Sequence, residues 1–121
     1  MGRLDDGFEG ALEVQPGEVL RWHAPATHRV RRTWVGGRVY VSDRRLFFCP
    51  GVLSRRRYGV LRVPLASIAD VQVVGRDMHV TAGGLRRRVI IKTDTGDEHA
   101  FSLPRFPKRS RELQALLAGR P

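Results

Sequence analysis

Alternation of apolar and polar residues with a period of two dominates the chain from residue 18 to residue 103. Successive side chains of a β-strand face opposite sides of a sheet, so this pattern predicts strands with one buried face. The predicted strands span residues 18–23 with an extension through 29–35 after a break at Pro25, then 38–42, 45–49, 57–63, 68–74, 88–93 and 99–103, with a loop at 77–84. We therefore expect about seven antiparallel strands.

Two short segments carry turn chemistry. Gly36-Gly37 suits a two-residue hairpin turn that requires positive φ, and Ser42-Asp43 followed by arginines suits a second turn. The strand after this second turn, residues 45–49, is apolar on both of its faces. Such a strand is expected to be covered on both sides, with Cys49 packed rather than reactive.

One amphipathic helix is predicted near residues 107–118. Pro107 suits a first helical position, Gly119 suits the end, and Leu113 and Leu117 recur at helical spacing. Buried leucines on one terminal helix would close the open side of a curved sheet. The pattern thus predicts a mainly β fold capped by one C-terminal helix.

Length and composition point to one small domain. The chain has 121 residues, of which 41% are hydrophobic, and this is enough for one core. No apolar run approaches the roughly 18 residues of a membrane span, and the acidic amino terminus does not resemble a signal peptide. Cys49 is the single cysteine, so no internal disulfide forms. We expect a cytoplasmic protein without a transmembrane segment.

Charge is distributed unevenly. The net charge is +10, and 20 of the 22 basic residues are arginines. Residues 1–18 hold five acidic residues and one basic residue, so the remainder carries +14. Residues 1–15 are accordingly predicted to form an acidic N-terminal arm before a basic domain at 16–118. A basic domain favours an anionic partner, although scattered arginines also serve simply to solvate outer faces.

Catalytic patterns are missing from the sequence. Nothing resembles a nucleophile elbow, a phosphate loop or a metal-binding HExxH helix. The four histidines do not stand at metal-site spacing with cysteines, and most carboxylates of the domain fall in predicted turns. We expect a non-catalytic protein with no cofactor and no metal.

Arginine clusters are the candidate binding residues. One cluster precedes Gly36-Gly37 and another ends the connection after Pro50, and a guanidinium group can hold phosphate through two parallel hydrogen bonds. The residues predicted in this way to bind anionic lipid are Arg29, Arg31, Arg32, Arg55, Arg56 and Arg57.

Residues 36–48 resemble the core motif of GRAM domains, Gly-x-Leu-Tyr-x-Thr-Asp-x-Arg-Leu-x-Phe, with Val39 and Ser42 as departures. Residues 16–20 and 24–28 look like the lead-in of bacterial GRAM-like proteins, and residues 63–68 look like the family's Ile-Pro-Leu-x-x-Ile step. The resemblance covers roughly residues 16–118.

This resemblance implies a pleckstrin-homology-like fold: two packed antiparallel sheets, or a partly open barrel, with a capping helix. It also implies a binding module whose basic residues flank the loops between strands one and two and between strands three and four. Arg21 and Arg29-x-Arg31 match the family's basic pattern loosely. Asp94, Asp97 and Glu98 would repel a phosphate if the last turn faces the site.

Three functions stay open at this point. The first is peripheral binding of anionic membrane lipid headgroups through the six arginines. The second is an interaction with an acidic protein or with a second copy of the chain, as a homo-oligomer paired through an edge strand. The third is nucleic-acid binding, for which no RNP-type or helix-turn-helix signature is present. Its candidate stacking residues are Trp22, Trp34, Tyr40 and Tyr58.

Overall fold

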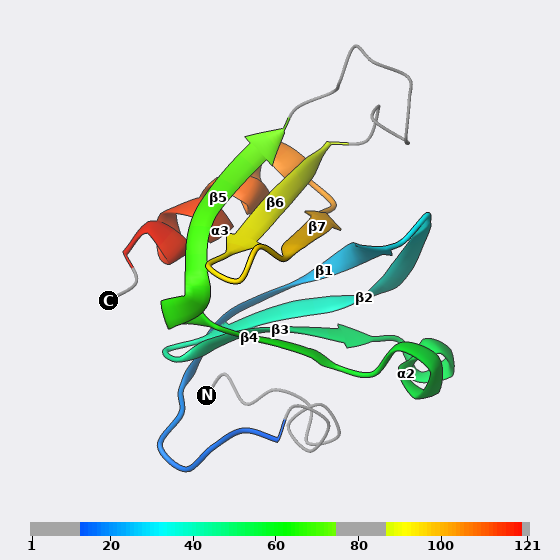
Figure 1. Ribbon diagram of the computed structural model, residues 1–121, viewed down its shortest axis with the longest axis horizontal. Coiled ribbons are helices and arrows are strands. Elements are labelled where there is room, and N and C mark those ends of the chain that lie inside the picture. Colours follow the sequence, from blue (N-terminus) through cyan, green and yellow to red (C-terminus); the bar gives the residue numbers. More distant parts are fainter. Residues whose placement is uncertain (1–12, 75–86, 120–121) are drawn as a thin grey trace.

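A computed structural model describes residues 13–74 and 87–119, and the predicted loop at 77–84 lies outside them. The described residues form seven antiparallel strands in one open sheet of order β4-β3-β2-β1-β7-β6-β5 (Figure 1). The strands are β1 (Leu20–Val30), β2 (Thr33–Ser42), β3 (Arg45–Pro50), β4 (Leu61–Pro64), β5 (Ile68–Val74), β6 (Arg88–Thr93) and β7 (Glu98–Ser102). The helices are α2 (Val52–Tyr58), the 3-10 turn η1 (Leu65–Ser67) and α3 (Phe106–Ala118). The mainly β fold with a C-terminal helix is confirmed.

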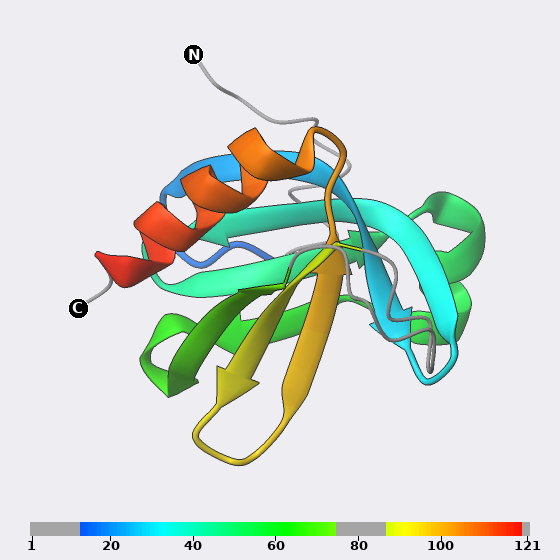
Figure 2. The same ribbon diagram turned by 90° about the horizontal axis from the view of Figure 1, so that it is seen from above.

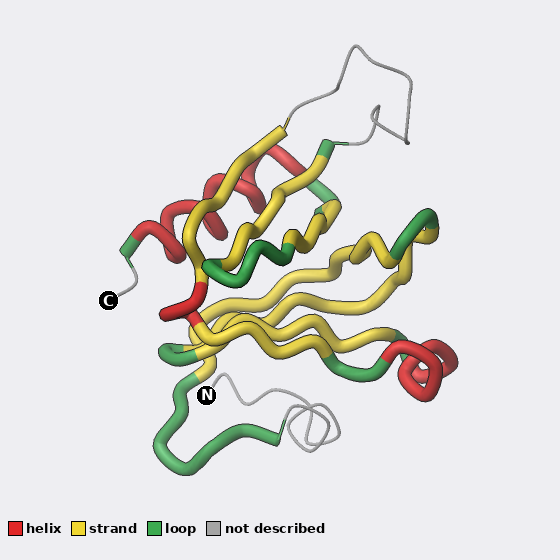
Figure 3. Tube along the Cα trace, in the orientation of Figure 1, coloured by secondary structure: helices red, strands yellow, loops and turns green. Residues whose placement is uncertain are grey.

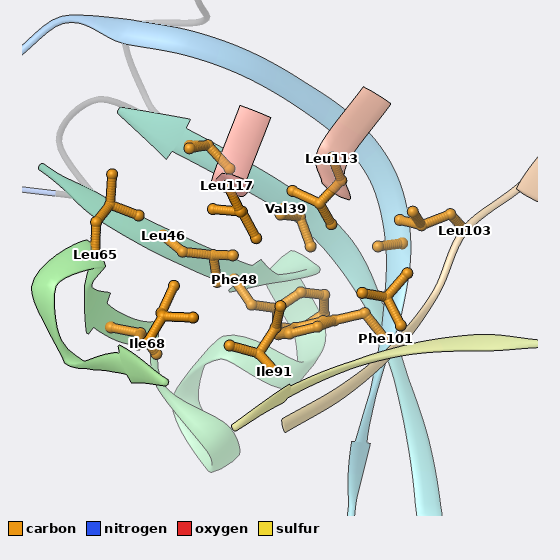
Figure 4. Close-up of a cluster of buried hydrophobic side chains, with 14 of the residues drawn as sticks. Val39, Leu46, Phe48, Leu65, Ile68, Ile91, Phe101, Leu103, Leu113 and Leu117 are labelled. Atoms are coloured by element: carbon orange, nitrogen blue, oxygen red, sulfur yellow. The ribbon is translucent and has the colours of Figure 1, made fainter. Parts of the chain in front are cut away.

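Strand β1 joins the two halves of the sheet. It pairs with β2 from Leu20 to Val30, but with β7 only at Thr27 and His28. The inner faces of both halves contribute to one apolar core, which α3 covers with Leu113 and Leu117 (Figures 2 and 4). Both leucines are fully buried, so α3 caps the core as the spacing of its leucines predicted.

A second apolar cluster lies on the opposite face of β2 and β3. Tyr40, Phe47 and Cys49 are its buried members. Val14 from the N-terminal segment packs against them, together with Leu20 and Val60. Strand β3 is therefore covered on both sides, as predicted, and Cys49 is buried.

The N-terminal segment is held by a buried carboxylate. Arg45 Nη2 donates to Glu18 Oε1 at 2.6 Å, and Ser42 Oγ donates to Glu18 Oε2 at 2.5 Å. Ser42 Oγ also accepts the backbone N–H groups of Arg44 and Arg45, so the predicted turn at Ser42-Asp43 is confirmed. Burial opposes ionisation of Glu18, but the hydrogen bonds from Arg45, Ser42 and Gln15 outweigh it and lower its pKa to about 2.

The expected turn at Gly36-Gly37 is wrong. Both glycines lie inside β2, and the two-residue turn consists of Arg31 and Arg32 instead. A Cβ atom at Gly37 would lie 2.2 Å from the carbonyl oxygen of Cys49, so close approach of β3 requires glycine here. Arg31 adopts the positive φ of the turn, at 58°.

Two further expectations are corrected. Pro25 does not break the first strand, because it lies within β1 opposite Arg38. The strand expected at 57–63 begins only at Leu61, and residues 52–58 form α2 (Figure 3). Three arginines in the last turn suit this helix, since cations there interact favourably with the helix dipole.

None of the helices in the described part of the chain is long and apolar enough to cross a bilayer.

The close approach at Gly37 predicts unequal effects at two neighbouring glycines. Gly37→Ala should destabilise the fold by about 1–3 kcal/mol, because its methyl group collides with backbone atoms of β3. Gly36→Ala is the matched control, since a Cβ atom there meets nothing within 4 Å. Urea unfolding measures both, and equal stabilities would contradict this packing.

The buried ion pair predicts a pH-dependent loss of stability. Because the pKa of Glu18 falls from 4.5 to about 2 on folding, its contribution is complete above pH 4.5 and is lost as the pH falls towards 2. Glu18→Gln should cost on the order of 3 kcal/mol at pH 7. Its deficit relative to the wild type should shrink between pH 4.5 and pH 2 in urea unfolding. A deficit independent of pH would contradict the ionic role.

Candidate functional site

A hollow lined by arginines lies at the end of the molecule away from α3. We call it the arginine hollow; it has a volume of about 580 Å³. Its residues come from the β1–β2 turn and from the C-terminal end of α2. These two segments lie at the same end of the molecule (Figures 1 and 2). The lining residues of the hollow are Val30, Arg31, Arg32, Thr33, Arg57 and Tyr58.

Local structure brings these arginines together. The β1–β2 pairing continues to Val30 and Thr33, so Arg31 and Arg32 form the tip of the hairpin and are exposed. Helix α2 ends at Tyr58, and the guanidinium carbon of Arg57 lies 5.5 Å from the Tyr58 ring centroid. This is within cation–π range, and both residues line the hollow.

A second hollow lies on the other side of the same turn. This side hollow, of about 350 Å³, forms where β1 leaves β7 beyond His28. Arg29 Nε donates to the carbonyl oxygen of Arg31 at 2.9 Å and so braces the turn. The lining residues are Arg29, Arg31, Arg88, Ile90, Glu98 and Ala100. The side hollow thus contains a carboxylate, that of Glu98.

The six predicted arginines are distributed over the two hollows and α2. Arg32 and Arg57 line the arginine hollow, Arg29 lines the side hollow, and Arg31 lines both. Arg55 is half-buried and donates through Nε to the carbonyl oxygen of Pro50 at 3.4 Å. Arg56 is exposed on α2 and lines neither hollow.

Charge is unbalanced at the arginine hollow. None of the ion pairs between described residues includes Arg31, Arg32 or Arg57. Glu13, the one described acidic residue of the predicted arm at 1–15, pairs with Arg62 at 2.8 Å instead. The hollow therefore offers three guanidinium groups to an anion from solution.

Sequence reasoning missed an apolar pocket beside the arginine hollow. It has a volume of about 240 Å³, and Val30 and Tyr58 line both it and the arginine hollow. Its wall comes from β1, β2, β3 and the α2–β4 connection. The sequence did not indicate this pocket, because the helical course of α2 was not predicted. The lining residues are His28, Val30, Val35, Phe48, Pro50, Tyr58, Gly59, Val60 and Leu61.

His28 is the histidine that lines this apolar pocket. Its ring stacks on Phe101 at a centroid distance of 4.9 Å and lies 5.2 Å from Phe48. Burial, and then the neighbouring ring of His99, lower the pKa of His28 to about 4. The imidazole is therefore neutral near pH 7, and the pocket stays apolar.

The structure also places the residues considered for metal binding and for base stacking. Residues 13–74 and 87–119 contain no group of three or more histidine, cysteine or carboxylate side chains that could hold a metal ion. Tyr40 is only 1% exposed, and Trp22 Nε1 donates to Glu112 Oε1 at 3.1 Å. Of the four candidate stacking residues, Tyr58 lines the arginine hollow.

Comparison with known proteins identifies the fold. No protein-family model matches the chain, and no curated protein matches it by sequence. A crystal structure of the C-terminal domain of an unknown protein from Leishmania infantum superposes with a TM-score of 0.73 at 12% identity, over 93% of this chain and 95% of that one. The Vps36 N-terminal PH domain superposes with a TM-score of 0.57 at 13% identity, over 87% and 86%. The chain has a pleckstrin-homology-like fold.

The environment of His28 predicts its titration. Because its pKa falls from 6.5 to about 4 on folding, the fold loses stability as the pH drops from 6.5 towards 4. In proton NMR, the His28 ring signals should titrate near pH 4, and a His28→Gln variant assigns them. A midpoint near 6.5 would contradict the burial of this ring.

Proposed function

We propose that this protein is a non-catalytic binding module that attaches peripherally to anionic membrane lipid headgroups through the arginine hollow. One observation carries the proposal: Arg31, Arg32 and Arg57 come from two separate segments, yet line a single open hollow. No ion pair between described residues neutralises them.

The chemistry of guanidinium groups supports a phosphate-bearing ligand. Arginine stays charged at all accessible pH values, and its planar fork matches two phosphate oxygens. Basic residues close to an anionic membrane contribute about 1 kcal/mol each. The net charge of +10 adds long-range attraction to such a surface.

The pleckstrin-homology-like fold supports a binding module in general. We further infer a GRAM-type domain of bacterial kind, because residues 36–48 resemble the GRAM core motif. On this proposal the protein is cytoplasmic and acts at the inner face of the membrane. It uses no cofactor, and its ligand is held by charge and shape rather than by covalent chemistry.

The arginine hollow predicts the effect of reversing its charges. Arg31→Glu with Arg57→Glu should reduce co-sedimentation with phosphatidylserine-containing vesicles at least tenfold, because two contributions of about 1 kcal/mol each are lost. Arg56→Glu with Arg111→Glu is the matched control. It makes the same charge change at two exposed positions outside the hollow, on α2 and α3.

A nucleic-acid shift at the same salt concentration distinguishes the remaining functions. Equal binding to vesicles and nucleic acid that vanishes near physiological ionic strength would indicate unspecific charge. An equal loss of vesicle binding in both double variants would also contradict a localised site. Absence of binding to either ligand would favour an acidic protein or a second copy of this chain as the partner.

A further inference from the structure

We propose that the ligand is an anionic amphiphile with a single alkyl or acyl chain, whose phosphate lies in the arginine hollow and whose chain enters the apolar pocket. This inference rests on the proposed function, because it uses the same arginines for the head of the ligand. It adds a second subsite and thereby names the class of lipid.

The two cavities are adjacent. Val30 and Tyr58 line both of them, so one molecule can occupy the arginine hollow and the apolar pocket together. Arg57 neighbours Tyr58 in sequence, and Arg31 neighbours Val30. The charged and apolar subsites thus share part of their wall.

The wall of the pocket suits a hydrocarbon chain better than water. Aliphatic and aromatic residues make up most of it, including Val35, Phe48 and Leu61. His28 packs its ring against Phe101 and Phe48, and is neutral near pH 7. An ordered water needs two to four polar partners, and this lining supplies few.

The volume of the pocket sets the length of chain. An apolar cavity of about 150 Å³ is known to bind benzene, and this one measures about 240 Å³. If a methylene group occupies about the volume of a water molecule in the liquid, roughly 30 Å³, the pocket holds about eight carbons. Longer chains would extend back out into solvent or the bilayer.

A chain-length series tests the proposal. The full chain is titrated with inorganic phosphate and with ethyl, butyl, hexyl, octyl and dodecyl phosphate below their micellar concentrations. Burial of each added methylene should raise the affinity about fourfold up to about eight carbons, after which it should level off. The His28 ring signals should shift with hexyl and octyl phosphate, but not with inorganic phosphate.

Variants separate the two subsites. Leu61→Phe fills the pocket without touching the arginine hollow, so it should remove the chain-length dependence and leave phosphate binding intact. Val73→Phe is the control, since Val73 is 38% exposed on β5 and lines neither cavity. If Leu61→Phe fails to fold, the shift of the His28 ring signals of the unsubstituted protein with octyl phosphate still tests whether the chain enters the pocket.

Two results would overturn the proposal. Phosphate binding that does not depend on chain length rejects the apolar subsite, while the vesicle assay continues to support the proposed function. An affinity for octyl phosphate that is undiminished in Arg31→Glu with Arg57→Glu shows a chain bound without its head, and this also rejects the two-part ligand. Absence of vesicle binding contradicts the proposed function, whereas absence of a chain-length dependence contradicts the two-part ligand. The failures of the two proposals are therefore distinguishable.

Discussion

The short contact between β1 and β7 determines the shape of the molecule. Strand β1 pairs with β2 over its whole length, but with β7 only at Thr27 and His28. Before this contact the halves of the sheet enclose the shared core, and beyond it they separate. The side hollow lies between the separating halves, whereas the arginine hollow lies between the β1–β2 turn and α2 within one half. His28 lies at the branch point, where it joins the core to the apolar pocket.

In the other half of the fold, both faces of β2 and β3 are buried. The inner face contributes Val39 and Phe48 to the main core, and the outer face contributes Tyr40 and Phe47 to the second cluster. A second covered face requires an additional segment, and the chain supplies it from its N-terminal side through Val14. The buried Glu18 carboxylate then attaches this segment to the β2–β3 turn, because Arg45 compensates the charge that burial would otherwise disfavour.

Local sequence patterns predicted those elements whose causes are local. Period-two alternation located most strands, leucine spacing located α3, and Ser42-Asp43 located a turn that Ser42 closes with its own hydroxyl group. The prediction at Gly36-Gly37 was wrong because a glycine pair is equally compatible with a turn and with the close approach of a neighbouring strand. Only the pairing of Gly37 with Pro50, which the structure shows, distinguishes these two possibilities. Helix α2 was missed because it is a seven-residue element between two strands, too short for a helical period to emerge.

The candidate site was predicted only in part, because a run of arginines is visible in the sequence but the directions of the side chains depend on the turn and on α2. The arginines of the β1–β2 connection were found as a run, but their distribution depends on the turn, which sends Arg29 to one side and Arg32 to the other. Helix α2 similarly separates Arg57 from Arg55 and Arg56, since only one of three consecutive helical residues can face a given direction. The side hollow is also lined by three arginines, but it contains the carboxylate of Glu98 as well and is therefore the poorer place for an anion. At the arginine hollow the arginines adjoin an apolar cavity, and this combination of charge and apolar surface favours an amphiphile over a purely polar anion.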